Sequence, residues 1–147
     1  MSEVVVNDAP LSLSEAEQDA WGERFARTLP QGAVIALHGD LGAGKTTLAR
    51  SLCKGLGVID LQAVASPTFS IVHEYETRNG VVVHADMYRL REARDLENLG
   101  WDELAARARA VIVEWPDRIP EAMPANAVHV RLAHDPARHD RRLIRVG

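Results

Sequence analysis

The sequence has a single cysteine, no long apolar run and no excess of positive charge, and each absence excludes a class of protein. Cys53 alone cannot form an internal disulfide or begin a cysteine-based metal site, so we expect it to pack on a helix face. The longest apolar runs, residues 33–37 and 110–113, are far shorter than the ~20 residues of a membrane-spanning helix. We therefore expect no membrane span.

The charge and the start of the chain argue against two further classes. The first residues lack the positive segment and the long apolar segment of an export signal, so we expect a cytoplasmic protein. The formal net charge is -4, whereas a protein that binds nucleic acid alone generally has a basic surface. We therefore expect any nucleic acid to reach this chain through a partner. The six histidines show no zinc-ligand spacing.

What is present is the balance of a globular protein, with 46% apolar and 26% charged residues. A chain of 147 residues can build one core of ordinary size but not two, and it contains no visible linker or repeat. We expect residues 1–147 to form one domain.

Hydrophobic spacing predicts alternating helices and strands. A Ser-x-x-Glu capping box at Ser14 and Glu17 begins the first helix, and Asn79-Gly80 joins two strands in a hairpin. One helix is expected over residues 14–29, and a second from residue 45 to the glycines Gly55 and Gly57, which end it. Residues 91–109 are expected to form two helical pieces that meet near Gly100. Strands are expected over residues 33–37, 69–75, 81–85, 110–114, 128–132 and 141–146.

This order of elements predicts an α/β fold, a P-loop NTPase-like sandwich in which helices flank a mixed central sheet. The sheet is expected to be parallel in its middle, where helices connect the strands, and antiparallel toward an edge, where hairpins connect them.

The most specific feature is Gly-Asp-Leu-Gly-Ala-Gly-Lys-Thr at residues 39–46, which matches the G-x-x-x-x-G-K-[ST] pattern of phosphate-binding loops. It joins a predicted buried strand to a predicted helix, so its backbone N–H groups and the helix N-terminus point at one anion site. Lys45 can reach the β- and γ-phosphates, and the Thr46 hydroxyl can bind Mg²⁺. The alternative is an ordinary glycine-rich turn. We expect ATP and Mg²⁺ to bind through Gly39, Asp40, Leu41, Gly42, Ala43, Gly44, Lys45, Thr46 and Thr47.

Two carboxylates compete to anchor the magnesium ion, each at the end of an apolar strand. Glu114 follows the most strand-like run outside the loop, and we expect it to be linked to the metal directly or through water. Asp86 is expected to orient water or the metal shell. For either residue the alternative is a solvated carboxylate at a strand end.

Two further observations concern the nucleotide. The hydroxyl of Thr68, in Ser-Pro-Thr-Phe at residues 66–69, could sense the γ-phosphate, or Pro67 could merely fix a turn there. No Asn-Lys-x-Asp segment is present to select guanine, which favours ATP over GTP.

Four motifs in series resemble the TsaE family, the ATPase component of bacterial tRNA threonylcarbamoyladenosine synthesis. They are His-Gly-Asp-Leu-Gly-Ala-Gly-Lys-Thr-Thr, Ser-Pro-Thr-Phe, His-Ala-Asp-Met-Tyr-Arg-Leu and Val-Glu-Trp-Pro, at residues 38–47, 66–69, 84–90 and 113–116. The resemblance implies a protein that works with TsaD and TsaB and contacts tRNA only through that complex. Its ATP hydrolysis would reset the complex between rounds of threonylcarbamoyl transfer to the adenosine next to the anticodon.

The resemblance also implies roles for individual residues. Thr46 and Glu114 would hold Mg²⁺, and Asp86 and Thr68 would support hydrolysis. Trp115 would lie beside the site. Nucleotide contacts are further implied for Ser14, which the capping box also explains, and for Arg138, where the glycine-led turn of the family is absent.

Two other functions share the phosphate-binding loop. A small-molecule kinase would need an acceptor pocket and an arginine-bearing lid, for which 147 residues leave little room. A nucleotide-dependent switch would bind a partner without needing turnover. Oligomeric state does not follow from the sequence.

Overall fold

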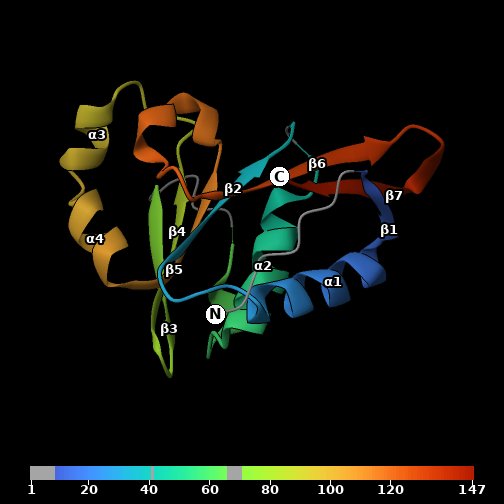
Figure 1. Cartoon of the computed structure of the whole chain (residues 1–147), viewed down its shortest axis with the longest axis horizontal. Helices are drawn as coiled ribbons and strands as arrows, with labels where there is room; N and C mark the ends of the chain where they lie inside the picture. The colour runs from blue at the N-terminus through green and yellow to red at the C-terminus, as the bar shows by residue number, and fades with distance from the viewer. Residues whose placement is uncertain (1–8, 41, 66–70) are drawn as a thin grey trace.

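A computed structural model of the chain describes residues 9–40, 42–65 and 71–147 (Figure 1). The described residues contain seven strands in one sheet and four α-helices. The strands are β1 (Leu11–Ser14), β2 (Ala33–His38), β3 (Val72–Thr77), β4 (Gly80–Asp86), β5 (Ala108–Glu114), β6 (Val128–Asp135) and β7 (Arg138–Val146). The helices are α1 (Glu15–Arg27), α2 (Lys45–Leu56), α3 (Ala93–Glu97) and α4 (Trp101–Arg107), with short 3₁₀ helices η1 (Leu61–Ala63), η2 (Pro116–Arg118) and η3 (Pro120–Ala122).

The sheet has the strand order β1-β7-β6-β2-β5-β4-β3. The four middle strands, β6, β2, β5 and β4, are parallel, because each connection between them crosses over the sheet. The prediction of a mixed sheet with a parallel middle is confirmed. Antiparallel pairs form both edges rather than one, since β3 pairs with β4 at one edge while β7 and β1 extend the other. Strand β1, which has only four residues, was not predicted from the sequence.

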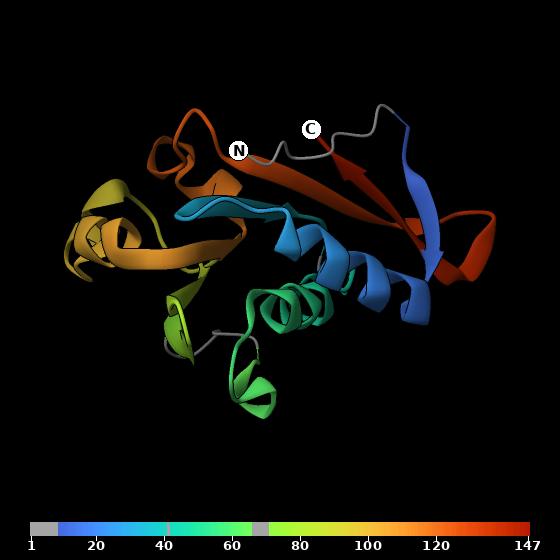
Figure 2. The same cartoon turned by 60° about the horizontal axis from the view of Figure 1, so that its bottom comes forward.

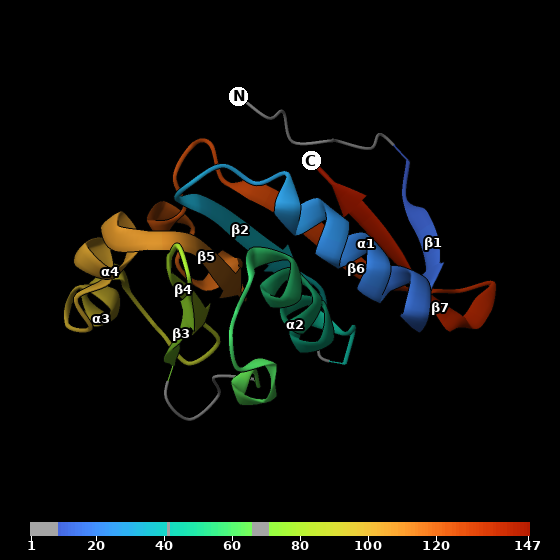
Figure 3. The same cartoon turned by 90° about the horizontal axis from the view of Figure 1, so that it is seen from below.

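Helices cover both faces of the sheet (Figures 2 and 3). Side chains of a strand alternate between faces, so Ala110 and Ile112 of β5 pack toward α1 and α2. Val111 and Val113 pack in a second apolar cluster with Leu96 of α3 and Trp101 of α4. The parallel strands are therefore buried on both sides, which explains why β5 is apolar almost without a break.

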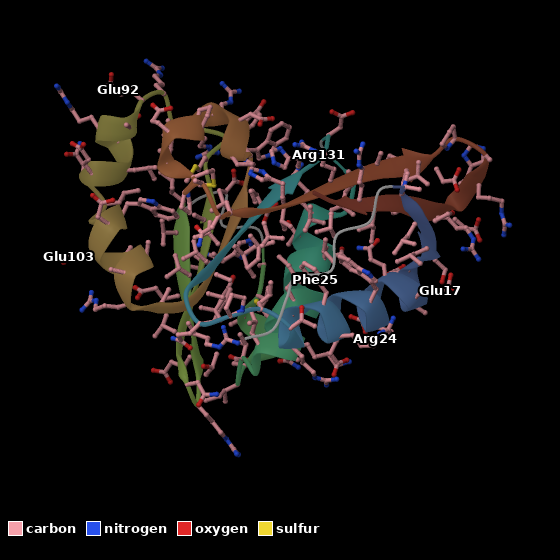
Figure 4. All side chains as sticks on the ribbon, viewed as in Figure 1. Glu17, Arg24, Phe25, Glu92, Glu103 and Arg131 are labelled. Carbon is pink, nitrogen blue, oxygen red and sulfur yellow. The ribbon has the colours of Figure 1, made fainter. Side chains whose placement is uncertain are left out.

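Helix α1 begins where the capping box predicts. The Ser14 hydroxyl accepts a hydrogen bond from the Glu17 N–H at 3.2 Å, and the Glu17 carboxylate accepts one from the Ser14 N–H at 2.9 Å. The helix ends at Arg27, before the predicted residue 29, because Pro30 disfavours helical backbone just ahead of it. In Figure 4, Arg24 lies on the outer side of α1, while Phe25 packs in the core.

The prediction that Gly55 helps to end α2 is wrong. Gly57 ends the helix in a left-handed conformation, with φ of 84°, whereas Gly55 lies inside it. A Cβ atom on Gly55 would lie 2.2 Å from the Glu23 carbonyl oxygen of α1. A Cβ atom on Gly22 of α1 would lie 2.7 Å from the Cβ of Ser51 on α2. These two glycines therefore permit the close contact of α1 and α2.

The remaining predicted elements are present, but two boundaries are wrong: β5 begins at Ala108, inside the predicted helical segment 91–109, and β7 begins at Arg138, before the predicted residue 141. Gly100 separates α3 from α4 as expected, and residues 78–79 form the tight loop of the β3–β4 hairpin, one residue before the predicted position. Phe69, the predicted start of β3, lies outside the described residues. Cys53 is buried on α2, and this burial raises the pKa of its thiol to about 12. None of the helices in the described ranges is long and apolar enough to span a membrane.

Candidate nucleotide-binding site

The glycine-rich loop lies between the end of β2 and the start of α2. Gly42 and Gly44 both have a left-handed backbone conformation, with φ of 82° and 99°. Any L-residue with a side chain would be strained in that conformation. Gly39 is required for a different reason, since a Cβ atom there would lie 2.8 Å from the Leu132 carbonyl oxygen of β6. Leu41 lies outside the described residues. The loop thus needs its glycines both for its conformation and for its contact with the sheet.

Lys45, the first residue of α2, turns its ammonium group back toward the loop. Its Nζ donates hydrogen bonds to the carbonyl oxygens of Gly39 and Asp40, at 2.5 and 3.1 Å. The same atom lies 4.0 Å from the ring centroid of Trp115, a cation–π distance. Burial lowers the pKa of Lys45, while the charges of Glu114, Asp86 and Asp40 act in the opposite direction. A largely buried cation therefore lies at the base of the site.

Glu114 reaches the loop because β5 pairs in parallel with β2. The register places Glu114 opposite Leu37, so its carboxylate emerges at the C-terminal ends of the parallel strands, where the loop begins. Its two oxygens lie 3.3 and 3.4 Å from the Thr46 hydroxyl, which donates to them. Glu114 is 3% exposed, and its Oε2 atom also lies 2.6 Å from Nε2 of His84. A buried carboxylate and a hydroxyl thus face each other at the start of α2.

Asp86 ends the next strand, β4, directly opposite Glu114 in the parallel register. One of its oxygens accepts a hydrogen bond from the Tyr88 N–H at 2.9 Å. Burial raises the pKa of Asp86, and the nearby negative charge of Glu114 acts in the same direction. The two predicted carboxylates therefore lie side by side at the C-terminal ends of neighbouring parallel strands.

Trp115 follows β5 in left-handed backbone with φ of 57°, a conformation that costs about 1–3 kcal/mol for a residue other than glycine. Pro116 then begins η2. This turn directs the indole over Lys45 and against the ring of Tyr88, whose centroid is 5.0 Å away. The guanidinium carbon of Arg118 lies 4.9 Å from the ring centroid of Tyr88. The local strain coincides with an aromatic wall beside the loop.

These residues enclose a cavity of about 350 Å³. It is lined by Gly42, Gly44, Lys45, Thr46, Thr47, Asp86, Tyr88, Arg89, Glu114 and Trp115. The structure thus brings together most of the predicted loop residues, both carboxylates and the tryptophan. Tyr88 was not predicted, although it lies within the predicted motif at residues 84–90. For Arg89 of the same motif, the sequence left open a charge-neutralising role or a structural ion pair, and Arg89 lines this cavity. The predicted Thr68 lies outside the described residues.

A second cavity of about 380 Å³ shares Gly44 and Thr47 with the first. Its other lining residues are Glu15, Gln18, His139, Asp140 and Arg142. It therefore lies between the start of α1 and the β6–β7 hairpin, the two regions for which nucleotide contacts were implied.

The two residues named for those contacts lie beside the second cavity rather than in its lining. The Ser14 hydroxyl caps α1, and the Arg138 side chain is 58% exposed and pairs with Asp140 at 3.5 Å. Gln18 and Arg142, four residues beyond each of them, line the cavity instead. Helical spacing from Ser14 could have indicated Gln18, whereas the side chains of β7 depend on its register with β6 and β1.

A family model described as threonylcarbamoyl adenosine biosynthesis protein TsaE matches residues 12–143. The chain belongs to the TsaE family. The resemblance inferred from the four motifs is therefore confirmed over nearly the whole sequence.

Several TsaE relatives are similar along most of the chain, and each is named tRNA threonylcarbamoyladenosine biosynthesis protein TsaE. The protein of Aquifex aeolicus is 42% identical over 106 residues, which cover 71% of this chain and 74% of the relative. That of Synechocystis is 41% identical over 107 residues, covering 70% and 66%. That of Bacillus subtilis is 38% identical over 119 residues, covering 81% and 73%.

The crystal structure of Bacillus subtilis YdiB has the same fold as this TsaE chain. The two superpose with a TM-score of 0.73 and 25% sequence identity, over 99% of this chain and 88% of YdiB. The predicted sandwich with a mixed, helix-flanked sheet is thus confirmed by the topology and by this likeness.

Proposed function

We propose that this TsaE chain is a magnesium-dependent P-loop ATPase that serves tRNA threonylcarbamoyladenosine biosynthesis. The observation that carries the proposal is the convergence of Lys45, Thr46 and Glu114 at the glycine-rich loop. The family match and the names of the relatives support the pathway.

The loop supplies the chemistry that a triphosphate needs. The first turn of α2 has no side-chain cap, so its backbone N–H groups can donate to phosphate oxygens. The Lys45 ammonium needs only to exchange two backbone carbonyls for phosphate oxygens, which are stronger acceptors because they are charged. The loop and Lys45 would hold the β- and γ-phosphates.

The residues present also fit a magnesium ion. Thr46 and Glu114 offer a hydroxyl and a carboxylate, the hard oxygen ligands that Mg²⁺ prefers. Within the described ranges, no group of three or more His, Cys, Asp or Glu is placed to hold a metal by itself. This is the donor set expected where magnesium takes one or two protein oxygens and completes its shell with phosphates and water. Bound there, the ion would neutralise charge on the transferring phosphoryl group.

In this proposal Asp86 would direct hydrolysis. It lines the first cavity on the strand next to Glu114, and one of its oxygens is held by the Tyr88 N–H. Burial raises its pKa, which makes it a better acceptor for a proton or hydrogen bond from water than an exposed aspartate. Asp86 would orient the attacking water.

The second cavity gives the rest of the nucleotide a place. It meets the first at Gly44 and Thr47, where a triphosphate would leave the loop. Gln18 and His139 there can donate to or accept from a ribose or an adenine edge, and Arg142 can approach a phosphate. We assign the nucleoside to this cavity.

TsaD and TsaB homologues are the proposed partners, with tRNA contacted only through their complex. The net charge of -4 fits a subunit that does not bind tRNA alone. Tyr88 is 48% exposed at the first cavity, beside Trp115 and Arg118, which gives a partner an aromatic and basic surface close to the phosphates. Such a partner could complete the site, so hydrolysis by the chain alone should be slow.

Phosphate release from Mg-ATP, with and without the TsaD and TsaB homologues, tests the proposal. We expect slow release that the partners accelerate, and release without any added acceptor separates an ATPase from a kinase. Lys45→Ala should weaken ATP binding at least about tenfold, or about 1.4 kcal/mol. Lys54→Ala, on the same helix but outside both cavities, is the matched control and should bind ATP normally. Absence of ATP binding at millimolar concentration, alone and with the partners, would refute the proposal.

A further inference from the structure

A row of hydrogen-bonded side chains connects the edge of the sheet to Glu114. It runs from His73 and Tyr75 on β3, through His84 on β4, to the carboxylate at the end of β5. The three strands are neighbours in the sheet (Figure 3). The cross-strand pairs His73 with His84 and His84 with Ile112 place these side chains on the face that α2 covers.

The distances are those of hydrogen bonds at each step. His84 Nε2 lies 2.6 Å from Glu114 Oε2, and His84 Nδ1 lies 3.0 Å from the Tyr75 hydroxyl oxygen. That hydroxyl lies 3.3 Å from Nδ1 of His73. His84 is 0% exposed and Tyr75 is 5% exposed, so the middle of the row is closed to solvent. Both ring nitrogens of a fully buried histidine are therefore satisfied by side chains.

The carboxylate determines the direction of the row. Glu114 can only accept when ionised, so Nε2 of His84 must carry a hydrogen. In the neutral imidazole Nδ1 then accepts, and the Tyr75 hydroxyl donates to it. Burial raises the pKa of Tyr75 to about 12, so this hydroxyl keeps its hydrogen at neutral pH. Each bond thus polarises the next one toward the carboxylate.

The row also distinguishes the two oxygens of Glu114. The Thr46 hydroxyl lies almost equally near both oxygens, at 3.3 Å from Oε1 and 3.4 Å from Oε2, but His84 contacts only Oε2, at 2.6 Å. A carboxylate held on one oxygen by a rigid, buried donor cannot rotate freely about its terminal bond. Oε1 is therefore the oxygen that is left for a further ligand beside Thr46.

We propose that His84, held in turn by Tyr75, is a positioning residue that presents Glu114 Oε1 to a divalent cation bound beside Thr46. This inference rests on the proposed function, because it concerns the cation that Thr46 and Glu114 would share. Groups that orient a metal-binding carboxylate change metal affinity by about 10–100-fold when they are removed. His84 lines neither of the two cavities, so its effect should reach the metal without changing metal-free nucleotide binding.

The test compares two polar replacements that differ in reach. The amide of Gln extends to the place of Nε2 and can still donate to Glu114, whereas the shorter amide of Asn ends near Nδ1 and can reach only Tyr75. We expect Mn²⁺ affinity, measured by electron paramagnetic resonance with a saturating non-hydrolysable ATP analogue, to fall about tenfold or more in His84→Asn. His84→Gln should stay within about threefold of the unmodified protein.

Two further variants separate positioning from stability. Val82→Ala opens a cavity two residues away on the same face of β4, so it should lower the thermal midpoint and leave Mn²⁺ affinity unchanged. Tyr75→Phe should reduce Mn²⁺ affinity by a few-fold, because His84 keeps its hydrogen bond to Glu114 and loses only the hydrogen bond from the Tyr75 hydroxyl. Analogue binding in EDTA should be the same in all variants.

The outcomes distinguish this inference from the proposed function. If the unmodified protein binds Mn²⁺ with the analogue and His84→Asn binds it equally well, the positioning role is overturned while the ATPase proposal stands. The role is also overturned if Mn²⁺ affinity simply follows the thermal midpoint across the four variants. If the unmodified protein shows no metal-dependent nucleotide binding, the proposed function itself fails.

Discussion

The contact between α1 and α2 makes a prediction in which two physical effects have opposite signs. Replacing Gly55 with Ala removes a glycine from the interior of α2, which by helix propensity alone should stabilise the protein by about 1 kcal/mol. The new methyl group, however, would lie 2.2 Å from the Glu23 carbonyl oxygen and 2.7 Å from the Ala26 Cβ. Backbone cannot yield as a flexible side chain does, so α1 and α2 must move apart.

The overpacking should win. Forcing an extra methyl group into a packed contact costs about 1–3 kcal/mol, and a clash with rigid backbone belongs at or above the upper end. After the gain in propensity, we expect a net loss of about 2 kcal/mol, which lowers the thermal midpoint of a chain of this size by roughly 4–8 °C. Because α2 also carries Lys45 and Thr46, ATP affinity should fall in the same variant.

Thermal and urea unfolding, followed by circular dichroism, measure this loss. Gly57→Ala is the comparison, since a Cβ atom there meets nothing within 4 Å and only the left-handed φ of 84° opposes it. It should cost about 1 kcal/mol. A Gly55→Ala protein that unfolds at a higher temperature than the unmodified chain would refute the argument, because propensity would then outweigh the contact.

Three other predictions concern the site and its surroundings. Glu114→Gln keeps a hydrogen-bond acceptor for His84 but removes the negative charge beside Thr46. Isothermal titration should then show that Mg²⁺ no longer strengthens ATP binding, while ATP affinity in EDTA is retained. Full Mg²⁺ dependence would contradict the metal site. Because burial raises the pKa of Asp86, its ionised form destabilises the folded state above that pKa. Asp86→Asn should therefore raise the thermal midpoint at pH 7, and this gain should disappear as the pH falls below the usual aspartate pKa of 3.8. A lower midpoint at pH 7 would contradict this prediction. At pH 8, Cys53 should react with a thiol reagent at least about tenfold more slowly in the native protein than in urea, because it is buried and its pKa is raised to about 12. Equal rates would show that α2 opens readily.

Features that depend on neighbours in the chain were predictable from the sequence. The capping box of α1 is a bond between residues three apart, and the phosphate-binding loop is a continuous segment whose glycines, lysine and threonine serve one turn of backbone. Alternating apolar strands and amphipathic helices likewise indicated a parallel middle of the sheet. These signals are local because hydrogen bonds and φ values within a turn involve only adjacent residues.

Contacts between distant segments were decided by the tertiary structure. Glu114 meets Thr46 only because β5 lies beside β2 in one register, and His84 meets Tyr75 and Glu114 only because three strands are adjacent. The second cavity combines α1 with β7, which is why Gln18 and Arg142 line it in place of the predicted Ser14 and Arg138. Gly55 resembles a helix stop in the sequence, but the backbone of α1 explains it. Register, strand order and helix contacts depend on packing between segments that are distant in the sequence, so they cannot be predicted from a local pattern of residues.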